Sequence, residues 1–427
     1  MRRKISGKTL LIDGPACIQL LSGKAEVLGA EIIPETKIII RKGKRLPIEA
    51  HPEFEAELFL GEEASCIETD VSATPPSWWK TVNEILSKEG KTITLILGGV
   101  DSGKTGFCVY LANSALKTNR KVSIIDCDLG QSDLGPPGTI GLCHVQKPFT
   151  DLFTLFPDDS IFIGITNPHG AVNKVLEAVK RLKEKALRNE DLLIVNTDGW
   201  IDGDDAVKYK LKLVEIINPD YIVAARIADE MDPIISSLEK GNVFIVDVPE
   251  NIKKRNRETR RLLRGFAYKK HLRGSKIRSF PLKRVKIEGS LNLNSERKSQ
   301  IKAKIEEILR TEILCFDETA DSIVLVIEKK AKINEEAVKV AETKLNKRLF
   351  VLREGDEKGL LVSLEDRFGK MLGIGVIQSV DFRKMNIKIC TPVNERVSLI
   401  RVSKIQLDSE GNEKRILFQD LELPRGA

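Results

Sequence analysis

The chain has 427 residues, too many for one ordinary core, and domain sizes of roughly 100 to 200 residues predict two or three domains, of which we expect three. Apolar residues (41%) and charged residues (31%) exclude a mainly disordered chain, and the modest net charge of +7 makes the location of positive charge the important question. Strand-length apolar runs and the lack of an apolar signal-peptide core predict a cytoplasmic protein that does not enter a membrane.

The first part of the chain reads as a small all-β domain. Short strand patterns at 9–12, 16–21 and 37–40 are separated by turns rich in Gly, Pro and Lys. A proline-rich joint at 74–77 then precedes a predicted helix at 78–88. We therefore expect the N-terminal β domain to span residues 1–75.

Apolar strands alternate with helix-period stretches over the next part of the chain. The predicted strands are 92–97, 121–125, 161–165, 192–195, 221–225 and 243–246. This alternation is typical of a mostly parallel, doubly wound α/β sheet, here assigned to residues 76–279. Helix signals at 295–311 and 334–347, with strands at 323–327, 359–363 and 386–391, predict a C-terminal α+β domain over 280–427.

The sequence GGVDSGKT at 98–105 follows an apolar strand, precedes a predicted helix at 107–116 and fits the pattern GxxxxGK[ST]. Glycines let successive backbone N–H groups point at phosphate oxygens, and the helix amino terminus adds a favourable field. Lys104 is predicted to reach the β and γ phosphates, and Thr105 to offer a hydroxyl ligand to Mg²⁺ or another divalent cation. The alternative, a chance match in a glycine-rich turn, is disfavoured by the strand and helix on either side.

Two carboxylates follow the next apolar strand, in the segment DCDLGQ at 126–131. Ligands of open α/β sheets bind at the carboxyl ends of the strands, so Asp126 suits a metal shell and Asp128 suits the acceptor of a hydroxyl proton. The alternative for Asp128 is a turn cap, since Asp is favoured in turns.

A third cluster, NTDGW at 196–200, again follows an apolar strand. Trp200 could stack on a nucleobase, a contact worth about 1 to 3 kcal/mol that does not depend on base identity. The alternative is a partly buried Trp that only packs, and the sequence leaves these two interpretations nearly even.

Residues 253–278 hold twelve Lys and Arg side chains against the single acid Glu258. On a helix, Arg257 with Arg261 and Arg260 with Arg264 are four residues apart, and each pair could clamp phosphates. The alternative is a solvated basic face. An upstream P-loop favours the functional interpretation, because phosphoryl transfer needs cations around the moving group.

In order, these segments and RETRRLLR at 257–264 resemble the polynucleotide 5′-hydroxyl kinase family, which includes the kinase subunit of the eukaryotic pre-mRNA cleavage complex, the ribosomal-RNA-processing kinase and archaeal relatives. The early GKAEVLGAE (23–31) and the late GLLVSL (359–364) and GIG (373–375) are similar to segments of its outer domains. The resemblance implies an α/β fold: a central P-loop NTPase domain with a mostly parallel sheet, flanked by a small N-terminal β-sandwich domain and a C-terminal α+β domain.

The resemblance also implies roles for individual residues. Lys104, Asp128 as base, Gln131 and the lid arginines would be catalytic, with the lid pair left open between Arg257 with Arg261 and Arg260 with Arg264. Gln131, Thr197, Gly199 and Trp200 would bind the nucleic-acid end, while Thr105 and Asp126 are expected to bind the metal from their own chemistry and positions, as argued above. Expected nucleotide-binding residues are Glu26, Gly98, Gly99, Val100, Asp101, Ser102, Gly103, Lys104, Thr105 and Gly106.

Two departures from the family pattern are Gly106, where relatives often carry Ser or Thr, and NPHG at 167–170, which leaves His169 without a role. The implied activity is transfer of the γ-phosphate of ATP, with Mg²⁺, to the 5′-hydroxyl end of single-stranded RNA or DNA, with RNA-processing proteins as partners of the outer domains. One alternative is an ATP-binding assembly subunit of RNA processing with little kinase activity. Another is a GTPase or ATPase switch, which lacks support because no Asn/Thr-Lys-x-Asp segment stands in a suitable place.

Overall fold

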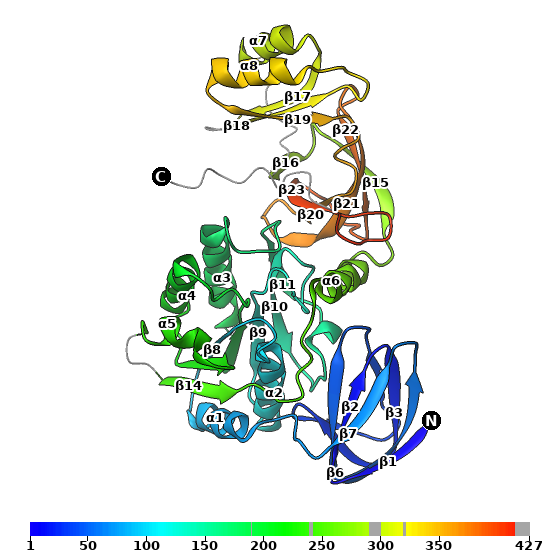
Figure 1. Cartoon of the computed structure of the whole chain (residues 1–427), viewed down its shortest axis with the longest axis vertical. Coiled ribbons are helices and arrows are strands. Elements are labelled where there is room, and N and C mark those ends of the chain that lie inside the picture. Colours follow the sequence, from blue (N-terminus) through cyan, green and yellow to red (C-terminus); the bar gives the residue numbers. More distant parts are fainter. Residues whose placement is uncertain (189, 239–241, 290–299, 319–321, 415–427) are drawn as a thin grey trace. The chain divides into compact units, whose positions relative to one another are not determined.

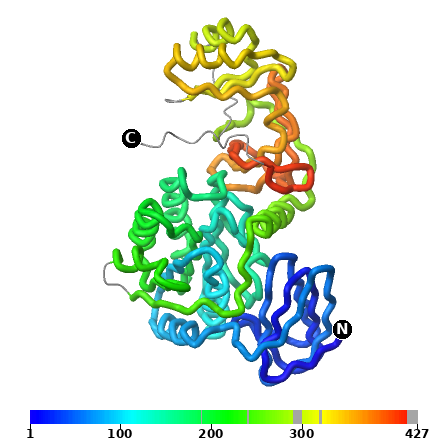
Figure 2. Tube along the Cα trace, in the orientation of Figure 1, coloured from blue at the N-terminus to red at the C-terminus, as the bar shows by residue number. Residues whose placement is uncertain are grey.

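The computed structural model describes residues 1–188, 190–238, 242–289, 300–318 and 322–414. The chain divides into two compact units, residues 1–267 and 268–427. Figures 1 and 2 trace the first unit from the blue N-terminal strands into the green α/β part, and the second from yellow-green to red.

The first unit begins with an antiparallel seven-stranded sheet, which we call the N-terminal sheet. Its strands are β1 (Arg2–Ser6), β2 (Thr9–Asp13), β3 (Ala16–Val27), β4 (Ala30–Ile32), β5 (Lys37–Ile40), β6 (Arg45–Leu60) and β7 (Ser65–Thr69). Buried and less buried residues alternate along β3 and β5, as expected for strands with one face on a core. The buried side includes Ile18, Leu20 and Ile38.

A second seven-stranded sheet, in the order β11-β10-β9-β12-β8-β13-β14, forms the α/β part of this unit. Its strands are β8 (Thr92–Gly98), β9 (Val122–Asp126), β10 (Thr139–Val145), β11 (Asp159–Phe162), β12 (Leu192–Asn196), β13 (Tyr221–Arg226) and β14 (Asn242–Asp247). The five strands from β9 to β14 are parallel, whereas β10 and β11 add an antiparallel edge. The predicted, mostly parallel sheet is therefore confirmed, and the predicted strand at 161–165 is shorter and antiparallel.

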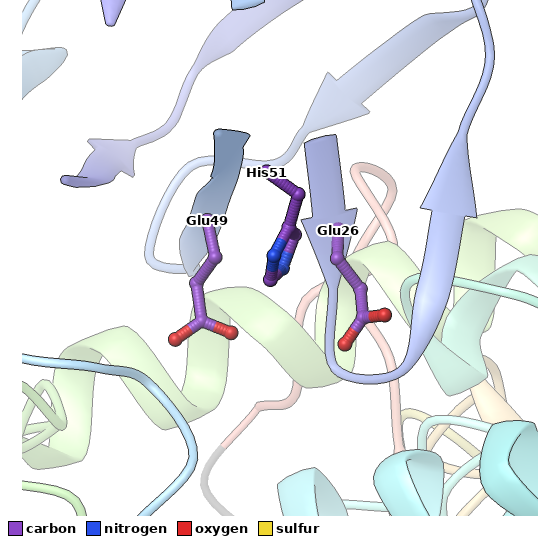
Figure 3. Close-up of side chains that lie close together, drawn as sticks. All are labelled: Glu26, Glu49 and His51. Carbon is purple, nitrogen blue, oxygen red and sulfur yellow. The ribbon is translucent and has the colours of Figure 1, made fainter. Parts of the chain in front are cut away.

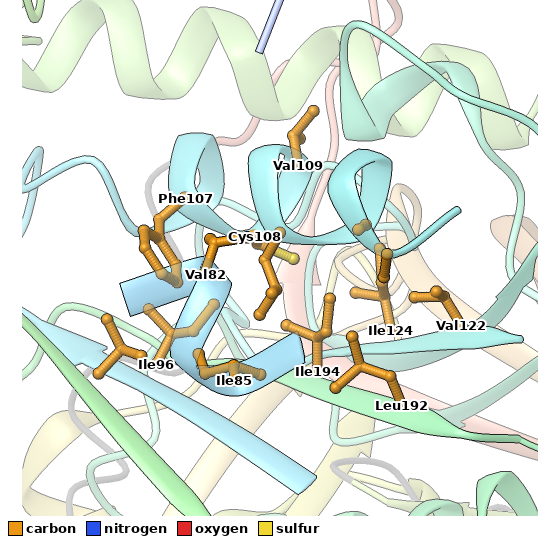
Figure 4. Packing of buried hydrophobic residues seen from close by; sticks show 14 of the residues in the cluster. Val82, Ile85, Ile96, Phe107, Cys108, Val109, Val122, Ile124, Leu192 and Ile194 are labelled. Atoms are coloured by element: carbon orange, nitrogen blue, oxygen red, sulfur yellow. The ribbon is translucent and has the colours of Figure 1, made fainter. Parts of the chain in front are cut away.

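Helices cover both faces of this sheet, as the labels in Figure 1 show. They are α1 (Pro76–Ser87), α2 (Lys104–Lys117), α3 (Val172–Ala186), α4 (Asp204–Ile217) and the short α5 (Asp232–Ile235), with 3₁₀ turns at Leu152–Thr154 and Asp229–Met231. Ile96 of β8 packs with α1 and α2 on one face (Figure 4), while its neighbours Leu95 and Leu97 pack with α3 and α4 on the other. Because the five strands from β9 to β14 are parallel, the loops that follow them open at the same edge of the sheet.

The basic segment forms α6 (Arg257–His271), which spans the boundary between the units. The second unit has a six-stranded sheet, β15-β22-β21-β20-β23-β16, and a three-stranded sheet, β17-β18-β19. Its elements are β15 (Lys276–Pro281), β16 (Lys286–Gly289), α7 (Gln300–Leu309), β17 (Ile313–Glu318), β18 (Ser322–Ile327), α8 (Glu335–Leu345), β19 (Arg348–Arg353), β20 (Leu360–Glu365), β21 (Met371–Asp381), β22 (Asn386–Thr391) and β23 (Leu399–Gln406).

The mixture of strands and helices in this second unit agrees with the α+β prediction. The first five residues of the helix predicted at 295–311 lie outside the described residues. The domain boundaries at 75/76 and 279/280 stay predictions, and the second of them falls within β15. In the described parts of the chain, no helix has the length and apolar character needed to cross a membrane.

Candidate active site

A cavity of about 580 Å³ lies in the first unit, lined by loops at the carboxyl ends of the parallel strands and by the N-terminal sheet. Its polar lining comes from residues far apart in sequence. They are Lys44, Arg45, Asp101, Ser102, Lys104, Thr105, Asp128, Gln131, Asp133, Thr150, Asp151, Thr166, Asn167, Asp198, Trp200, Asp202, Asn251, Lys253, Arg255, Arg260 and Arg264. Apolar side chains such as Leu28, Ile38 and Trp78 line it too, so one space offers both a base-sized apolar surface and many cations.

The turn between β8 and α2 has the conformation that its glycines permit. Gly103 has φ +87°, and at Gly98 a Cβ would meet the Ala225 carbonyl oxygen at 2.5 Å. Residues 100–106 line the cavity, with Lys104 as the first residue of α2. The predicted phosphate-binding loop therefore sits at a helix amino terminus, which favours anions.

Lys104 is buried, and its ammonium donates a hydrogen bond of 2.5 Å to the Gly99 carbonyl oxygen. Burial lowers the pKa of Lys104 to about 8, against the opposing effect of the Asp128 carboxylate. A buried ammonium is costly without an anion beside it. The cavity is thus prepared for a negatively charged ligand at this position.

Asp126 lies at the buried end of β9, beside Asn196 at the end of β12, and these two residues are paired in the sheet register. The Asn196 amide donates to Asp126 Oδ1 at 3.0 Å and to Thr105 Oγ1 at 3.5 Å. Burial, then the charges of Asp128 and Asp133, raises the pKa of Asp126 to about 7.

This arrangement fits a magnesium ion. The Thr105 hydroxyl and the Asp126 carboxylate are oxygen ligands gathered around one amide, and Asn196 Oδ1 is buried with no hydrogen-bond partner within the described chain. A cation there would favour the ionised form of Asp126 over the proton that burial otherwise favours.

Asp128 follows β9 and faces the cavity. Its Oδ1 accepts hydrogen bonds from the backbone N–H groups of Gly130 (3.0 Å) and Gln131 (2.8 Å). Burial, then the Asp198 carboxylate, raises the pKa of Asp128. The Asp128 side chain therefore caps its own turn, as in the alternative interpretation, and this half-buried carboxyl group also lines the cavity.

Gln131 lies in the same loop and donates through Nε2 to the carbonyl oxygens of Gly130 (2.7 Å) and Arg260 (3.4 Å). Its buried Oε1 has no hydrogen-bond partner among the described residues. A buried acceptor that faces a cavity is suited to a hydroxyl group of a ligand.

Trp200 lines the cavity and is half-buried against other rings. It stacks on Tyr209 with 5.7 Å between ring centroids, and His169 meets it edge-on at 5.6 Å. Both interpretations of Trp200 thus hold geometrically, since it packs on Tyr209 and also faces the cavity. His169, left without a role by the sequence, supports this ring.

The turn before Trp200 is held by a buried network around Asp198. Its carboxylate accepts from the Trp200 backbone N–H and the Tyr209 hydroxyl, both at 2.9 Å, and pairs with the fully buried Lys210 at 3.0 Å. Gly199 fits against the P-loop, because a Cβ there would lie 2.7 to 2.9 Å from atoms of Val100. Thr197 is buried outside the cavity lining and donates to the Ile96 carbonyl oxygen at 2.8 Å, so its predicted contact with substrate stays a prediction.

The two candidate lid pairs on α6 differ in position. Arg260 and Arg264 line the cavity, whereas Arg257 and Arg261 are exposed and are absent from its described lining. Arg260 donates to Asp101 of the P-loop at 3.2 Å. The geometry therefore favours Arg260 with Arg264 as the pair that faces a bound phosphate chain.

Glu26 lies on β3 outside the described cavity lining, and its carboxylate pairs with Lys117 at 2.8 Å. Figure 3 shows it beside Glu49 and His51, whose potential ligand atoms lie within 4.8 Å of one another and of its own. Glu49 accepts from Ser72 and from the Ala73 backbone N–H, so both carboxylates have partners. A nucleotide contact by Glu26 stays a prediction.

Sequence reasoning missed several cavity residues. Arg255 contacts Asp101 through its backbone N–H at 3.0 Å and its Nε at 3.4 Å. Lys44 comes from the segment RKGKR at 41–45, which reads as a turn, and pairs with Asp133. Lys44 could have been found from the run of four cations in the five residues 41–45. Arg255 could have been found from its position in the basic segment 253–278.

Comparisons with known proteins show the family and the fold of this chain. A family model described as the P-loop of the mRNA cleavage and polyadenylation factor CLP1 matches residues 98–274. The chain is 31% identical to a polyribonucleotide 5′-hydroxyl-kinase of Methanocaldococcus jannaschii, over 76% of this chain and 90% of that protein. It is 32% identical to a polyribonucleotide 5′-hydroxyl-kinase of Pyrococcus furiosus, over 79% and 93% respectively.

Human polynucleotide 5′-hydroxyl-kinase NOL9 is 32% identical over 32% of this chain and 20% of its own length. A chain of the solved wild-type Clp1p–Pcf11p complex has the same fold, with a TM-score of 0.68 at 14% identity, over 95% of this chain and 98% of that one. The three-part architecture is therefore that of Clp1p: an antiparallel β part, a P-loop part and a C-terminal part.

Proposed function

This chain belongs to the polyribonucleotide 5′-hydroxyl-kinase family, and we propose that it transfers the γ-phosphate of ATP to the 5′-hydroxyl end of a polynucleotide in RNA processing. One observation carries the proposal: a single cavity contains the P-loop lysine, the half-buried carboxyl group of Asp128 and two lid arginines. Phosphoryl transfer needs these three kinds of group around one phosphorus atom.

ATP binds with its phosphates on residues 98–105 and the amino terminus of α2. Lys104, whose pKa burial lowers, regains a stable positive charge beside the β and γ phosphates. The apolar lining from Leu28, Ile38 and Trp78 offers a surface for the base. ATP binding therefore gives the buried ammonium of Lys104 an anionic partner and covers the apolar wall with the base.

Asp128 accepts the proton of the 5′-hydroxyl. Two backbone N–H groups orient its carboxylate through Oδ1, and its raised pKa makes it a stronger base than an exposed aspartate. The 5′-oxygen forms a bond to the γ-phosphorus, the bond from that phosphorus to the β–γ bridging oxygen breaks, and ADP leaves. Catalysis is then mostly positioning and electrostatics.

Arg260 and Arg264 neutralise the charge that develops on the transferred group. Thr105 and Asp126 would hold Mg²⁺, which supplies charge neutralisation at the phosphates when bound. Trp200 stacks on the terminal base, and Gln131 Oε1 accepts a hydrogen bond from a substrate hydroxyl. The arginines and the metal ligands thus act on the phosphates of ATP, whereas Trp200 and Gln131 act on the polynucleotide end.

The test is transfer of labelled γ-phosphate from ATP to matched RNA and DNA oligonucleotides with 5′-hydroxyl ends. The same oligonucleotides with 5′-phosphate ends are the control, since their end is blocked. We expect label on the 5′-hydroxyl strands alone and no transfer by Lys104→Ala. ATP binding without transfer would instead favour the assembly subunit, and ATP hydrolysis without transfer would favour a switch.

A further inference from the structure

Two cations of the N-terminal sheet reach the loop that carries the proposed base. Arg41 and Lys44 lie between β5 and β6, and both contact Asp133 of the α/β part, at 3.1 Å and 2.5 Å. The guanidinium of Arg41 also pairs with Asp151 at 2.9 Å and lies 3.4 Å from the centre of the Phe153 ring. We call Arg41, Lys44 and Asp133 the clamp.

Asp133 lies in the loop after β9 that also carries Asp128 and Gln131, which we call the catalytic loop. Asp133 is five residues after Asp128 and two after Gln131, and its backbone N–H donates to Asp126 Oδ2 at 3.2 Å. The Ser132 hydroxyl donates to the same oxygen at 3.0 Å. Asp133 is therefore held on one side by the proposed metal ligand and on the other by the N-terminal sheet.

The clamp is shielded from water, unlike most ion pairs of this chain. The side chains of Arg41, Lys44 and Asp133 are only 12%, 16% and 11% exposed. Lys44 and Arg41 hold the pKa of Asp133 well below its usual range, despite its burial. Removing Lys44 leaves the buried Asp133 carboxylate with Arg41 alone, and Arg41 is shared with Asp151, so the loop would be held less firmly.

A purely structural contact between two sheets could use apolar residues, which cost less to bury than charges. Here a directional contact is made to one loop, and that loop carries Asp128, Gln131 and the partners of Asp126. Shifting reacting groups by about 1 Å can cost roughly 100-fold in rate. Ion pairs with a defined direction, such as those of Asp133, can hold the reacting groups of this loop in one position.

We propose that Arg41 and Lys44 are positioning residues for phosphoryl transfer: through Asp133 they hold the catalytic loop in place opposite the P-loop. The inference rests on the proposed function. It gives the N-terminal sheet a part in the chemical step, in addition to its share of the cavity wall.

The experiment compares Lys44→Met and Asp133→Asn with a matched control, Lys42→Met. Lys42 is in the same segment but pairs with Glu63 on the surface, where their side chains are 46% and 65% exposed. We expect kcat to fall about 10-fold to 100-fold in the clamp variants, with the Kd for ATP within about threefold of wild type. Lys42→Met keeps wild-type kcat, and Lys44→Arg restores most of the loss.

A second measurement needs no kinase activity. Amide hydrogen exchange over residues 127–134 should accelerate in Lys44→Met and stay unchanged in Lys42→Met, because only the first removes one of the two cations that hold Asp133. Unchanged exchange, or unchanged kcat in both clamp variants, would overturn the inference while wild-type transfer still supports the kinase. Loss of ATP binding and of melting temperature in parallel with kcat would also overturn it, in favour of a general folding role. A wild-type chain without transfer would count against the proposed function alone.

Discussion

The guanidinium of Arg260 donates a 3.2 Å hydrogen bond to Asp101, so the arginine-rich helix α6 is joined directly to the phosphate-binding loop. Arg255 contacts the same carboxylate, through its backbone N–H at 3.0 Å. Asp101 is thereby an anion that holds two cations at the place where phosphates would bind. An incoming triphosphate meets arginines that are already oriented.

This relationship predicts an asymmetry between the two overlapping arginine pairs. Arg260→Ala should lower kcat for phosphate transfer by about 100-fold, because a cation beside the moving group is lost. Arg257→Ala, an exposed residue on the same helix, is the control and should stay within about twofold of wild type. Equal losses in both variants would contradict the assignment of the pair.

Lys104 should weaken the fold while serving the reaction. Its pKa falls from 10.5 to about 8 on burial, so below pH 8 the folded state carries an ammonium that burial disfavours. Lys104→Met should therefore abolish transfer and increase the free energy of unfolding at pH 7 by roughly 3 kcal/mol, less the lost hydrogen bond to Gly99.

The destabilisation caused by the charged Lys104 should decrease as the pH rises. The cost is fully present below about pH 8 and disappears as the pH rises past 10.5, above which the lysine is mostly neutral in both states. Denaturant unfolding of both proteins at pH 7 and pH 9.5 measures it. A variant less stable than wild type at pH 7, or a gap that widens with pH, would be inconsistent with the buried charge.

The pH dependence of kcat/KM for ATP should be bell-shaped. Activity rises with pH as Asp126 ionises, with a pKa that burial raises to about 7, and falls as Lys104 loses its proton near pH 8. Raising the Mg²⁺ concentration should move the acid limb to lower pH, because the cation competes with the proton on Asp126. An acid limb that ignores Mg²⁺ would show that Asp126 is not a metal ligand.

Trp200 should act on the polynucleotide and not on ATP. Trp200→Ala should raise KM for a 5′-hydroxyl oligonucleotide about tenfold, since base stacking is worth roughly 1 to 3 kcal/mol, and leave KM for ATP unchanged. Trp200→Phe keeps an aromatic face and should recover part of the loss. Trp79→Ala, at a tryptophan 60% exposed and outside the described cavity lining, is the control. An unchanged oligonucleotide KM would refute the stacking role.

Local sequence patterns predicted which candidate site residues lie at the ends of strands. The strand, glycine loop and helix around Lys104, and the carboxylates after β9, were predictable because each motif needs only neighbouring residues. The antiparallel strand β10 was not, since its pairing with β9 depends on contacts made after the chain turns back. The α6 pairs were equally spaced in sequence, and tertiary packing alone separates Arg260 from Arg257.

Contacts between segments that are far apart in the chain could not be predicted from the sequence. Lys44 and Asp133 are 89 residues apart, and Arg260 and Asp101 are 159 apart. Lys44 read as one of several turn lysines, because charge alone does not indicate burial. The structural role of Asp198 could not be predicted either, because its partners Tyr209 and Lys210 contact it only once α4 packs on the sheet.

In the proposed reaction, Asp128 accepts the proton of a 5′-hydroxyl during transfer from ATP. The most direct measurement is the single-turnover rate of γ-phosphate transfer to a 5′-hydroxyl RNA by wild type and by Asp128→Asn, with the Kd for ATP measured in parallel. We expect the wild type to transfer, and the variant to bind ATP normally but transfer at least about 100-fold more slowly. An Asp128→Asn protein that transfers phosphate at the wild-type rate would show that Asp128 is not the base.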